Sequence, residues 1–104
     1  MTEAIYLTSE DVAELADQPD VEDYINVVQD GYRQRGEGAP AKPRTTLHPN
    51  EGPWGMLTSY MAILPETGAM GGYMYAAGFA AEDGWLTTSL WAADSGEFLA
   101  HLDG

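Results

Sequence analysis

The four basic residues of this chain are the side chains best suited to binding a small anion. Arg33, Arg35, Lys42 and Arg44 lie within twelve positions, in a chain of 104 residues whose formal net charge is −13. A guanidinium can grip a carboxylate through two parallel hydrogen bonds, which fix the orientation of the anion as well as its charge. We therefore expect an anionic small molecule to bind near this segment.

Two of these four cations have another explanation. Arg33 and Arg35 stand where a helix is expected to end, and cations at that position offset the negative end of the helix dipole. Arg44 lies in the sequence Pro43-Arg44-Thr45 beside a predicted strand, where the alternative to a ligand role is a surface ion pair. The residues alone leave both roles of Arg44 open.

The sequence contains no recognisable catalytic arrangement. No GxGxxG follows a strand and opens a helix, and no GKS/T phosphate loop is present. His48 and His101 stand alone in predicted strands, where a structural role is commoner, while Asp94 and Glu97 bracket a turn. Nothing resembles a nucleophile with a base and an orienting group. Without cysteine there is no disulfide or thiolate metal site, and we expect no catalytic, cofactor-binding or metal-binding residue.

The composition narrows the class of protein and its partners. The electrostatic field of a chain with a net charge of −13 repels nucleic acid and anionic membranes. No apolar run approaches the ~20 residues that cross a bilayer, and Met1-Thr2-Glu3-Ala4 lacks the segments of a signal peptide. We therefore expect a cytoplasmic protein. An acidic surface with one lysine suits concentrated salt, which screens self-repulsion. A halophilic source is our hypothesis, and an acidic mesophilic protein is the alternative.

The first third of the chain predicts one short strand and two helices. Ile5 to Leu7 is typical of an edge strand. Thr8 and Ser9 can cap a first helix that Pro19 ends, and Asp20 can cap a second helix that Gly36 and Gly38 end. The second helix carries an apolar stripe formed by Val21, Tyr24, Ile25, Val28 and Tyr32. The following residues, to position 43, are predicted to form a loop.

The remaining residues alternate as strands do. Five strands are expected over Thr45 to His48, Met56 to Leu64, Gly72 to Ala77, Trp85 to Ala92 and Glu97 to Leu102. Turns are expected at 49–53, 65–68, 82–84 and 94–96. Tyr73 and Tyr75 should point to one face of the sheet. Two helices packed on an antiparallel meander predict a single α+β domain over residues 1–104.

These features, taken in order, resemble the first third of the ornithine cyclodeaminase/mu-crystallin family. The resemblance spans essentially the whole chain. It rests on four segments: Leu7-Thr8-Ser9-Glu10-Asp11-Val12, Gly36-Glu37-Gly38 with Pro43-Arg44-Thr45, Thr67-Gly68-Ala69-Met70-Gly71-Gly72, and Leu90 to Gly104. Each segment is weakly specific alone, but four in order at suitable separations are fairly specific.

The resemblance implies a two-domain enzyme, of which this chain corresponds to the first domain only. Full members add a Rossmann domain that binds NAD or NADP, so the cofactor would lie outside this chain. The first domain supplies the substrate pocket and a homodimer interface, where sheets of two subunits join into a barrel-like assembly. The shared chemistry is hydride transfer at a carbon that bears an amine or imine next to a carboxylate.

Two residues are assigned to the substrate through the same resemblance. Arg44 matches the family arginine that holds the substrate carboxylate. Tyr73 stands where the family usually has a lysine, and tyrosine donates a hydrogen bond without carrying charge near pH 7. The resemblance therefore implies that both residues bind an amino-acid or imino-acid carboxylate, and it leaves ornithine specificity in doubt.

Two functions of different class follow. The first is a substrate-binding and dimerisation domain of an NAD(P)-dependent amino-acid or imine enzyme, which is inactive alone. The second is a stand-alone acidic module that dimerises and binds small carboxylates without enzymatic activity. We favour the first because Asp103-Gly104 coincides with the family's domain boundary. It predicts exposed apolar surface where the missing parts would pack, whereas the second predicts a closed dimer.

Overall fold

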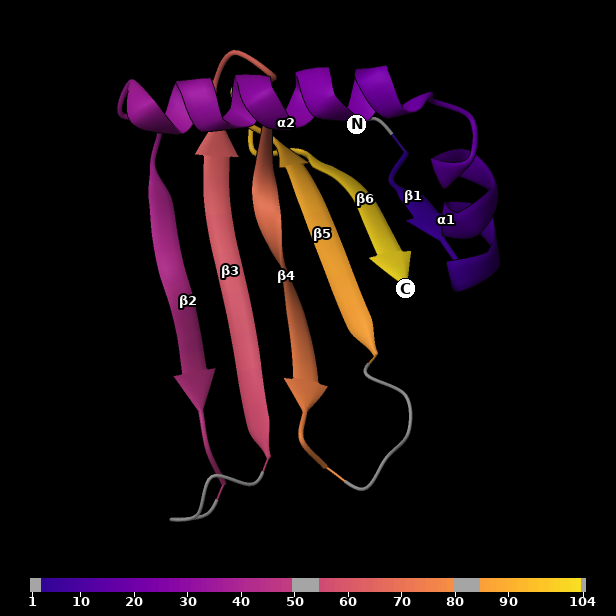
Figure 1. Ribbon diagram of the computed structural model, residues 1–104, viewed down its shortest axis with the longest axis vertical. Helices are drawn as coiled ribbons and strands as arrows, with labels where there is room; N and C mark the ends of the chain where they lie inside the picture. The colour runs from indigo at the N-terminus through magenta and orange to yellow at the C-terminus, as the bar shows by residue number, and fades with distance from the viewer. Residues whose placement is uncertain (1–2, 50–54, 80–84, 104) are drawn as a thin grey trace.

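The computed structural model describes residues 3–49, 55–79 and 85–103. Within them the chain forms one strand, two helices and five further strands, as Figure 1 shows. In order they are β1 (Ile5–Leu7), α1 (Ser9–Ala16), α2 (Val21–Gly36), β2 (Ala41–Leu47), β3 (Met56–Leu64), β4 (Ala69–Ala77), β5 (Leu86–Ala92) and β6 (Phe98–Asp103). The expected α+β class is confirmed.

Both helices begin at the residues that the sequence predicts. The Thr8 side chain accepts a hydrogen bond from the Asp11 amide, and the Asp11 carboxylate accepts one from the Thr8 amide. Asp20 and Asp23 form the same reciprocal pair at the start of α2. Each cap satisfies amide groups that have no partner inside the helix and contributes about 1 kcal/mol. Local chemistry therefore fixes where each helix starts.

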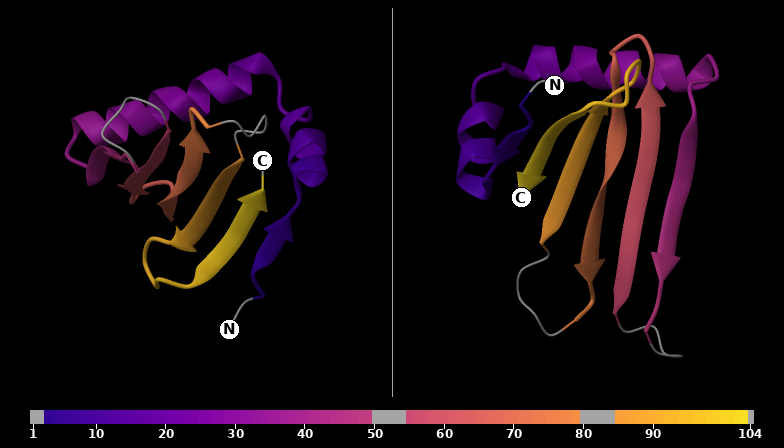
Figure 2. Two further views of the ribbon diagram at one scale, coloured as in Figure 1. Left: turned by 90° about the horizontal axis from the view of Figure 1, so that it is seen from below. Right: turned by 180° about the vertical axis from the view of Figure 1, so that it is seen from behind.

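The six strands form one sheet in the order β1-β6-β5-β4-β3-β2. Strands β2 to β6 pair with their sequence neighbours in antiparallel fashion, which is the expected meander. Strand β1 lies at the edge, as expected, but it runs parallel to β6, so the sheet is mixed. The parallel pairing is possible because α1, α2 and the whole meander connect the two strands (Figure 2).

Two strands begin earlier than the sequence predicted. Strand β2 starts at Ala41, inside the expected loop, and β4 starts at Ala69, because the β3–β4 ladder continues to the pair Leu64–Ala69. The tight turn over residues 65–68 that closes this hairpin is confirmed. Gly68 takes a φ of +83° there, a conformation that favours glycine. The turns predicted at 50–53 and 82–84 lie outside the described residues.

A buried glutamine attaches α2 to the end of the sheet. Gln34 is 2% exposed, and its side-chain oxygen accepts a hydrogen bond from the Glu66 amide at 3.1 Å. Its nitrogen donates to Asp30 Oδ2 at 2.8 Å and to Thr67 Oγ1 at 2.9 Å. The helix thus crosses one end of the strands and is held by the β3–β4 turn (Figure 1).

The apolar stripe of α2 does not pack against the sheet. All five of its residues are exposed, with Val21 at 74% and Tyr32 at 75%. The polar Gln34 takes the place that an apolar side chain was expected to fill. No helix in the described part of the chain is long and apolar enough to cross a membrane.

The two faces of the sheet differ in what they carry. Strand alternation sends Tyr60 and Leu64 of β3 to the face where α2 lies, since a Cβ added at Gly31 of α2 would lie 3.9 Å from the Leu64 side chain. We call this the helix face. Met61 and Ile63 point to the opposite face, which we call the methionine face. Within the described residues Ala39 is the only buried apolar side chain, so both faces leave apolar groups open.

Candidate functional site

A β-bulge determines which face Arg44 reaches. Strand β2 pairs Lys42 with Met61 and Thr45 with Ser59, and its register shifts between Lys42 and Thr45. Both partners belong to the methionine face, so Lys42 and Thr45 point there, and Arg44, next to Thr45, points to the helix face. Without the extra residue, positions 42 and 44 would share one face. The bulge therefore separates the two cations.

Arg44 is a cation without an acidic partner among the described residues. Its side chain is exposed, and no ion pair links it to any of the acidic groups that the structure describes. Arg44 is nevertheless close enough to the helix face to lower the pKa of the Tyr73 phenol, against stronger opposing effects of burial, Tyr60 and Tyr75. A guanidinium that is left open in so acidic a protein is available to an anion from solution.

The other basic residues are used differently, and the four do not form one patch. Arg33 contacts three carboxylates, those of Asp30, Glu37 and Glu66, at 2.7–3.1 Å. Both Arg33 and Arg35 lie in the last turn of α2, as expected. Arg35 donates to the Ala39 carbonyl oxygen. The basic segment is thus divided by the fold, and Arg44 is its member on the helix face of the sheet.

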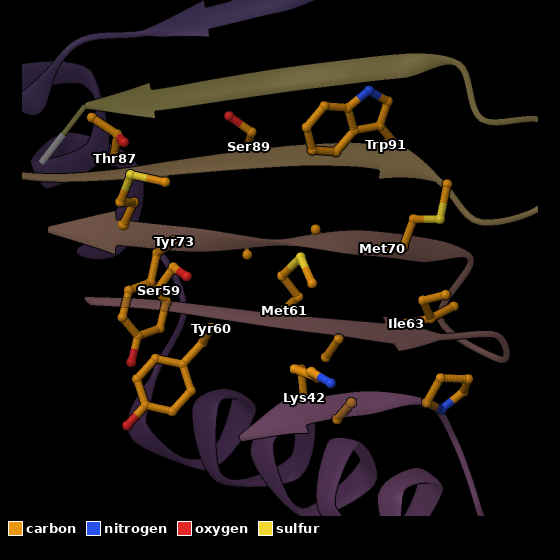
Figure 3. Close-up of a pocket in the computed structure, with 16 residues that line it drawn as sticks. Lys42, Ser59, Tyr60, Met61, Ile63, Met70, Tyr73, Thr87, Ser89 and Trp91 are labelled. Carbon is orange, nitrogen blue, oxygen red and sulfur yellow. The ribbon is translucent and has the colours of Figure 1, made fainter. Parts of the chain in front are cut away.

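Three tyrosines lie beside Arg44 on the helix face. Tyr60 pairs with Tyr73 across β3 and β4, and their ring centroids are 4.9 Å apart. Tyr75, two residues further along β4, stacks on Tyr73 with centroids 6.0 Å apart. The rings of Tyr60 and Tyr73 lie next to each other in Figure 3. The predicted common face of Tyr73 and Tyr75 is therefore what the strand geometry produces.

The electrostatics of this tyrosine cluster keep Tyr73 neutral. Burial raises the pKa of the Tyr73 phenol most, followed by the neighbouring Tyr60 and Tyr75, and Arg44 offsets part of the rise. A phenol with a raised pKa is protonated at every ordinary pH. Tyr73 can therefore donate a hydrogen bond but cannot supply the charge of a lysine.

Of the four residues Arg44, Tyr60, Tyr73 and Tyr75, only Arg44 and Tyr73 were assigned to the site from the sequence. Neither Tyr60 nor Tyr75 was expected to belong to the site, and only the pairing of β3 with β4 places Tyr60 against Tyr73. A weak signal exists for Tyr75, since residues i and i+2 of a strand share a face. No comparable signal exists for Tyr60, because its register depends on the length of the β3–β4 turn.

The methionine face carries an extended hollow. It is an open groove of about 650 Å³ over β2 to β5. Its apolar lining comes from three strands, with Met61, Ile63, Met70, Met74 and Trp91. Figure 3 shows Met61, Ile63, Met70 and Trp91 over one side of the sheet, with Lys42 at the border. Met61 is 61% exposed and Met74 is 49% exposed. The groove is an apolar surface rather than a set of converging polar groups.

His101 is not isolated, contrary to expectation. Its Nδ1 lies 3.1 Å from Ser89 Oγ, and its Nε2 lies 3.1 Å from Asp103 Oδ1. The Tyr6 hydroxyl donates to Asp103 Oδ2 at 2.7 Å, and the Tyr6 ring stacks on the His101 ring. A serine, a base and an orienting carboxylate are thus in line, an arrangement that the sequence did not suggest. We interpret it as the contact that holds β1 to β6, since it joins these strands side by side.

The remaining acid–base candidates have local roles. His48 Nδ1 lies 3.0 Å from the Gly55 carbonyl oxygen. Asp94 is exposed in the turn before β6, and the Glu97 amide donates to Ser95 Oγ. No group of three or more His, Asp or Glu side chains that could hold a metal ion occurs among the described residues.

Tyr6→Phe should change how the stability of the protein depends on acid. The hydrogen bond from Tyr6 is the largest cause of the lowered pKa of Asp103. A carboxyl whose folded pKa is depressed stabilises the fold above its unfolded pKa of about 4, and this stabilisation is lost as pH falls through the folded pKa. Tyr6→Phe should therefore be less stable at pH 7 and lose less stability on acidification.

Urea unfolding midpoints between pH 7 and pH 2.5 test this expectation. Tyr24→Phe is the matched control, because the Tyr24 hydroxyl donates to the Ala16 carbonyl oxygen and not to a carboxylate. Tyr24→Phe should shift the midpoint equally at every pH. Parallel pH profiles for Tyr6→Phe and the unmodified chain would show that the Tyr6–Asp103 bond has no such effect.

Comparison with known proteins places this fold. No protein-family model matches the sequence, and no curated protein matches it. Among solved structures the chain is similar to a probable ornithine cyclodeaminase from Bordetella pertussis Tohama I, with a TM-score of 0.75 and 20% sequence identity. The similarity covers 97% of this chain and 30% of that one. The family resemblance of the sequence is thereby supported at the level of the fold, and this chain has the fold of one part of a probable ornithine cyclodeaminase.

Proposed function

We propose that this chain is the substrate-binding and dimerisation domain of an ornithine cyclodeaminase/mu-crystallin-like, NAD(P)-dependent amino-acid or imine enzyme, and that it is not catalytic alone. The observation that carries the proposal is the position of Arg44. It is a guanidinium without an acidic partner among the described residues, on the same face as Tyr73. The fold shared with a probable ornithine cyclodeaminase supports the assignment.

The residues of this chain do not fit the cofactor of such an enzyme. A dinucleotide site needs a glycine-rich turn between a strand and the helix that follows it. In the described residues the connection from a strand into a helix is Thr8, between β1 and α1, and it contains no glycine. We therefore assign no residue of this chain to NAD or NADP, whose binding we place in another domain.

The role that we assign to this chain is to hold the substrate carboxylate. Arg44 would bind it through two parallel N–H···O bonds, and the Tyr73 hydroxyl would donate a third. An oriented carboxylate fixes the position of the adjacent amine-bearing or imine-bearing carbon, where hydride transfer takes place in our proposal. No proton transfer is assigned to a residue of this chain.

Arg44→Lys should weaken carboxylate binding by about 1–3 kcal/mol, because lysine cannot make the paired hydrogen bonds. Calorimetric titration with L-alanine, L-proline and L-ornithine, each compared with its carboxamide, measures this in molar salt. Salt screens the general attraction of the chain for cationic amides. A carboxylate that binds no better than its amide would contradict the proposal.

The chain offers a closely matched control for charge. Arg44→Gln and Lys42→Gln each remove one positive charge from β2, but on opposite faces of the sheet. Arg44→Gln should abolish the preference for the carboxylate, and Lys42→Gln should leave it intact. Equal losses in both variants would mean that the anion responds only to net charge.

We also propose that two copies associate through the methionine face. Exposed apolar side chains of this density are typical of a surface that another protein covers. The open edge of the sheet is a poor alternative, because β2 carries Pro43 and a bulge, which both oppose pairing with another strand. The proposed contact is therefore face to face. In the parent enzyme it would join the sheets of two subunits.

Met74→Glu should weaken this association roughly tenfold or more, since Met74 pairs with Ser59 and Thr87 and a carboxylate there would be buried without a cationic partner. Light scattering should find a dimer of the unmodified chain in molar salt, where repulsion between two chains of −13 charge is screened. Val27→Glu, at a position on α2 that is 70% exposed, is the control and should remain dimeric. A monomer under these conditions would overturn the dimerisation proposal and leave the carboxylate assignment to its own test.

A further inference from the structure

The tyrosine cluster suggests what is attached to the carboxylate. Tyr60, Tyr73 and Tyr75 come from two adjacent strands and form a continuous row of rings, with centroid distances of 4.9 and 6.0 Å. All three are half-buried, so part of each ring remains open on the helix face. Nothing in the proposed function uses Tyr60 or Tyr75, and Tyr73 contributes only its hydroxyl there.

The row lies next to Arg44 rather than apart from it. Arg44 is on β2, Tyr60 on β3 and Tyr73 on β4, and neighbouring strands are about 4.8 Å apart. The tyrosine rings are therefore the neighbouring surface for the substituent of a carboxylate that the Arg44 guanidinium holds. Arg44 is close enough to influence the Tyr73 phenol electrostatically. Anion site and ring surface are thus parts of one site.

We propose that the site selects carboxylates with an aromatic ring a few atoms from the carboxyl group, an inference that rests on the proposed function. Aromatic rings attract one another in offset-stacked or edge-to-face arrangements beyond the effect of buried area. An aliphatic substituent of equal size is stabilised only by the apolar area that it buries. The row of tyrosines therefore distinguishes a phenyl group from a saturated ring.

A cationic substituent is the competing ligand for tyrosine rings, and Arg44 argues against it. Ammonium groups bind ring faces through the ring quadrupole. A second cation over Tyr73 would lie beside the Arg44 guanidinium and be repelled by it, with no acidic partner of Arg44 among the described residues to offset the repulsion. An uncharged aromatic ring suffers no such repulsion. The observations therefore favour the aromatic carboxylate.

The test compares 3-phenylpropionate with 3-cyclohexylpropionate, which share the carboxylate and chain length and differ in the ring. Calorimetry on the unmodified chain in molar salt should find the phenyl compound bound roughly 2- to 12-fold more tightly, the range expected for one aromatic pair. Tyr73→Leu should remove the preference while both compounds still bind through Arg44. Tyr32→Leu, at an exposed position of α2, should retain it.

The outcomes separate this inference from the proposed function. Equal affinities in the unmodified chain, or a preference that survives Tyr73→Leu, would overturn the aromatic preference while the dependence on Arg44 stands. If 4-aminobutyrate binds more tightly than 3-phenylpropionate, the site prefers a cationic substituent, and the aromatic preference is overturned. If neither propionate binds, or Arg44→Lys changes neither affinity, the proposed function and this inference fail together. Tyr75→Leu gives the same comparison if Tyr73→Leu does not fold.

Discussion

Gly72→Ala should destabilise the protein by about 3 kcal/mol or more, at or above the upper end of the range for overpacking. A Cβ at this position would lie 1.8 Å from the Tyr60 carbonyl oxygen and 3.1 Å from the Met61 Cα. Both contacts are backbone atoms of the adjacent strand β3, so no side chain can move aside. The strands would have to separate in the middle of the sheet, between Met61 and Ser89, the residues that pair with Gly72.

Gly36→Ala is the control for this substitution. No atom lies within 4 Å of a Cβ at Gly36, which ends α2. Alanine is the better helix former, so the free energy of unfolding should be unchanged or rise by up to about 1 kcal/mol. Thermal and urea unfolding of the two variants measure the difference. Similar stabilities would mean that β3 and β4 are not as close at Gly72 as described.

Gln34→Leu should cost about 1–3 kcal/mol, because it removes the two hydrogen bonds of Gln34 to the β3–β4 turn, each worth about 0.5–1.5 kcal/mol. The Glu66 amide loses its acceptor and the Thr67 hydroxyl loses a donor. Leucine has nearly the right size and is apolar, so an account based on hydrophobic burial alone would predict greater stability. A fall in the free energy of unfolding would show that hydrogen bonds of Gln34 hold α2 to the sheet, and a rise would show that apolar burial does.

Gln29→Leu on the same helix controls for helix propensity and added apolar area. Gln29 is exposed, so its replacement should change the free energy of unfolding by less than about 0.5 kcal/mol. Amide hydrogen exchange adds a local readout. Protection of the β3–β4 turn should fall in Gln34→Leu and stay unchanged in Gln29→Leu. Stability gained by Gln34→Leu would show that its hydrogen bonds do not hold the helix.

Features encoded by neighbouring residues could be predicted from the sequence. The capping residues Thr8 and Asp20, the end of α2 at Gly36 and the turn over residues 65–68 were all recognised, because each depends on side chains within a few positions. The meander followed from strand periodicity and short turns. The parallel pairing of β1 with β6 could not be predicted, since it joins residues as distant in sequence as Ile5 and Ala100.

The composition of the candidate site depends on pairing rather than on local sequence. Arg44 reaches the helix face because of one extra residue in β2, and no local pattern distinguishes a bulge between Lys42 and Thr45 from a regular strand. Tyr60 joins Tyr73 through the β3–β4 register. The burial of Gln34 was equally unforeseen, because a polar residue late in an amphipathic helix is usually solvated.

The division of the four cations shows why clustering in sequence is a weak guide to a binding site. Arg33 is occupied by three carboxylates, and Lys42 points to the methionine face. Only Arg44 combines an exposed guanidinium with neighbouring rings on the helix face. The proposed carboxylate site therefore needs the fold to select one cation of the four.

The most direct test of this account is the map of NMR chemical-shift changes as L-proline is added to the isotopically labelled chain in molar salt. The account predicts that changes concentrate on the helix face, at Arg44 with its side-chain Nε–H and at Tyr60 and Tyr73. Met61 and Trp91 on the methionine face should not respond. Changes confined to Met61, Trp91 and Lys42, or an Arg44 signal that does not move, would contradict the carboxylate site.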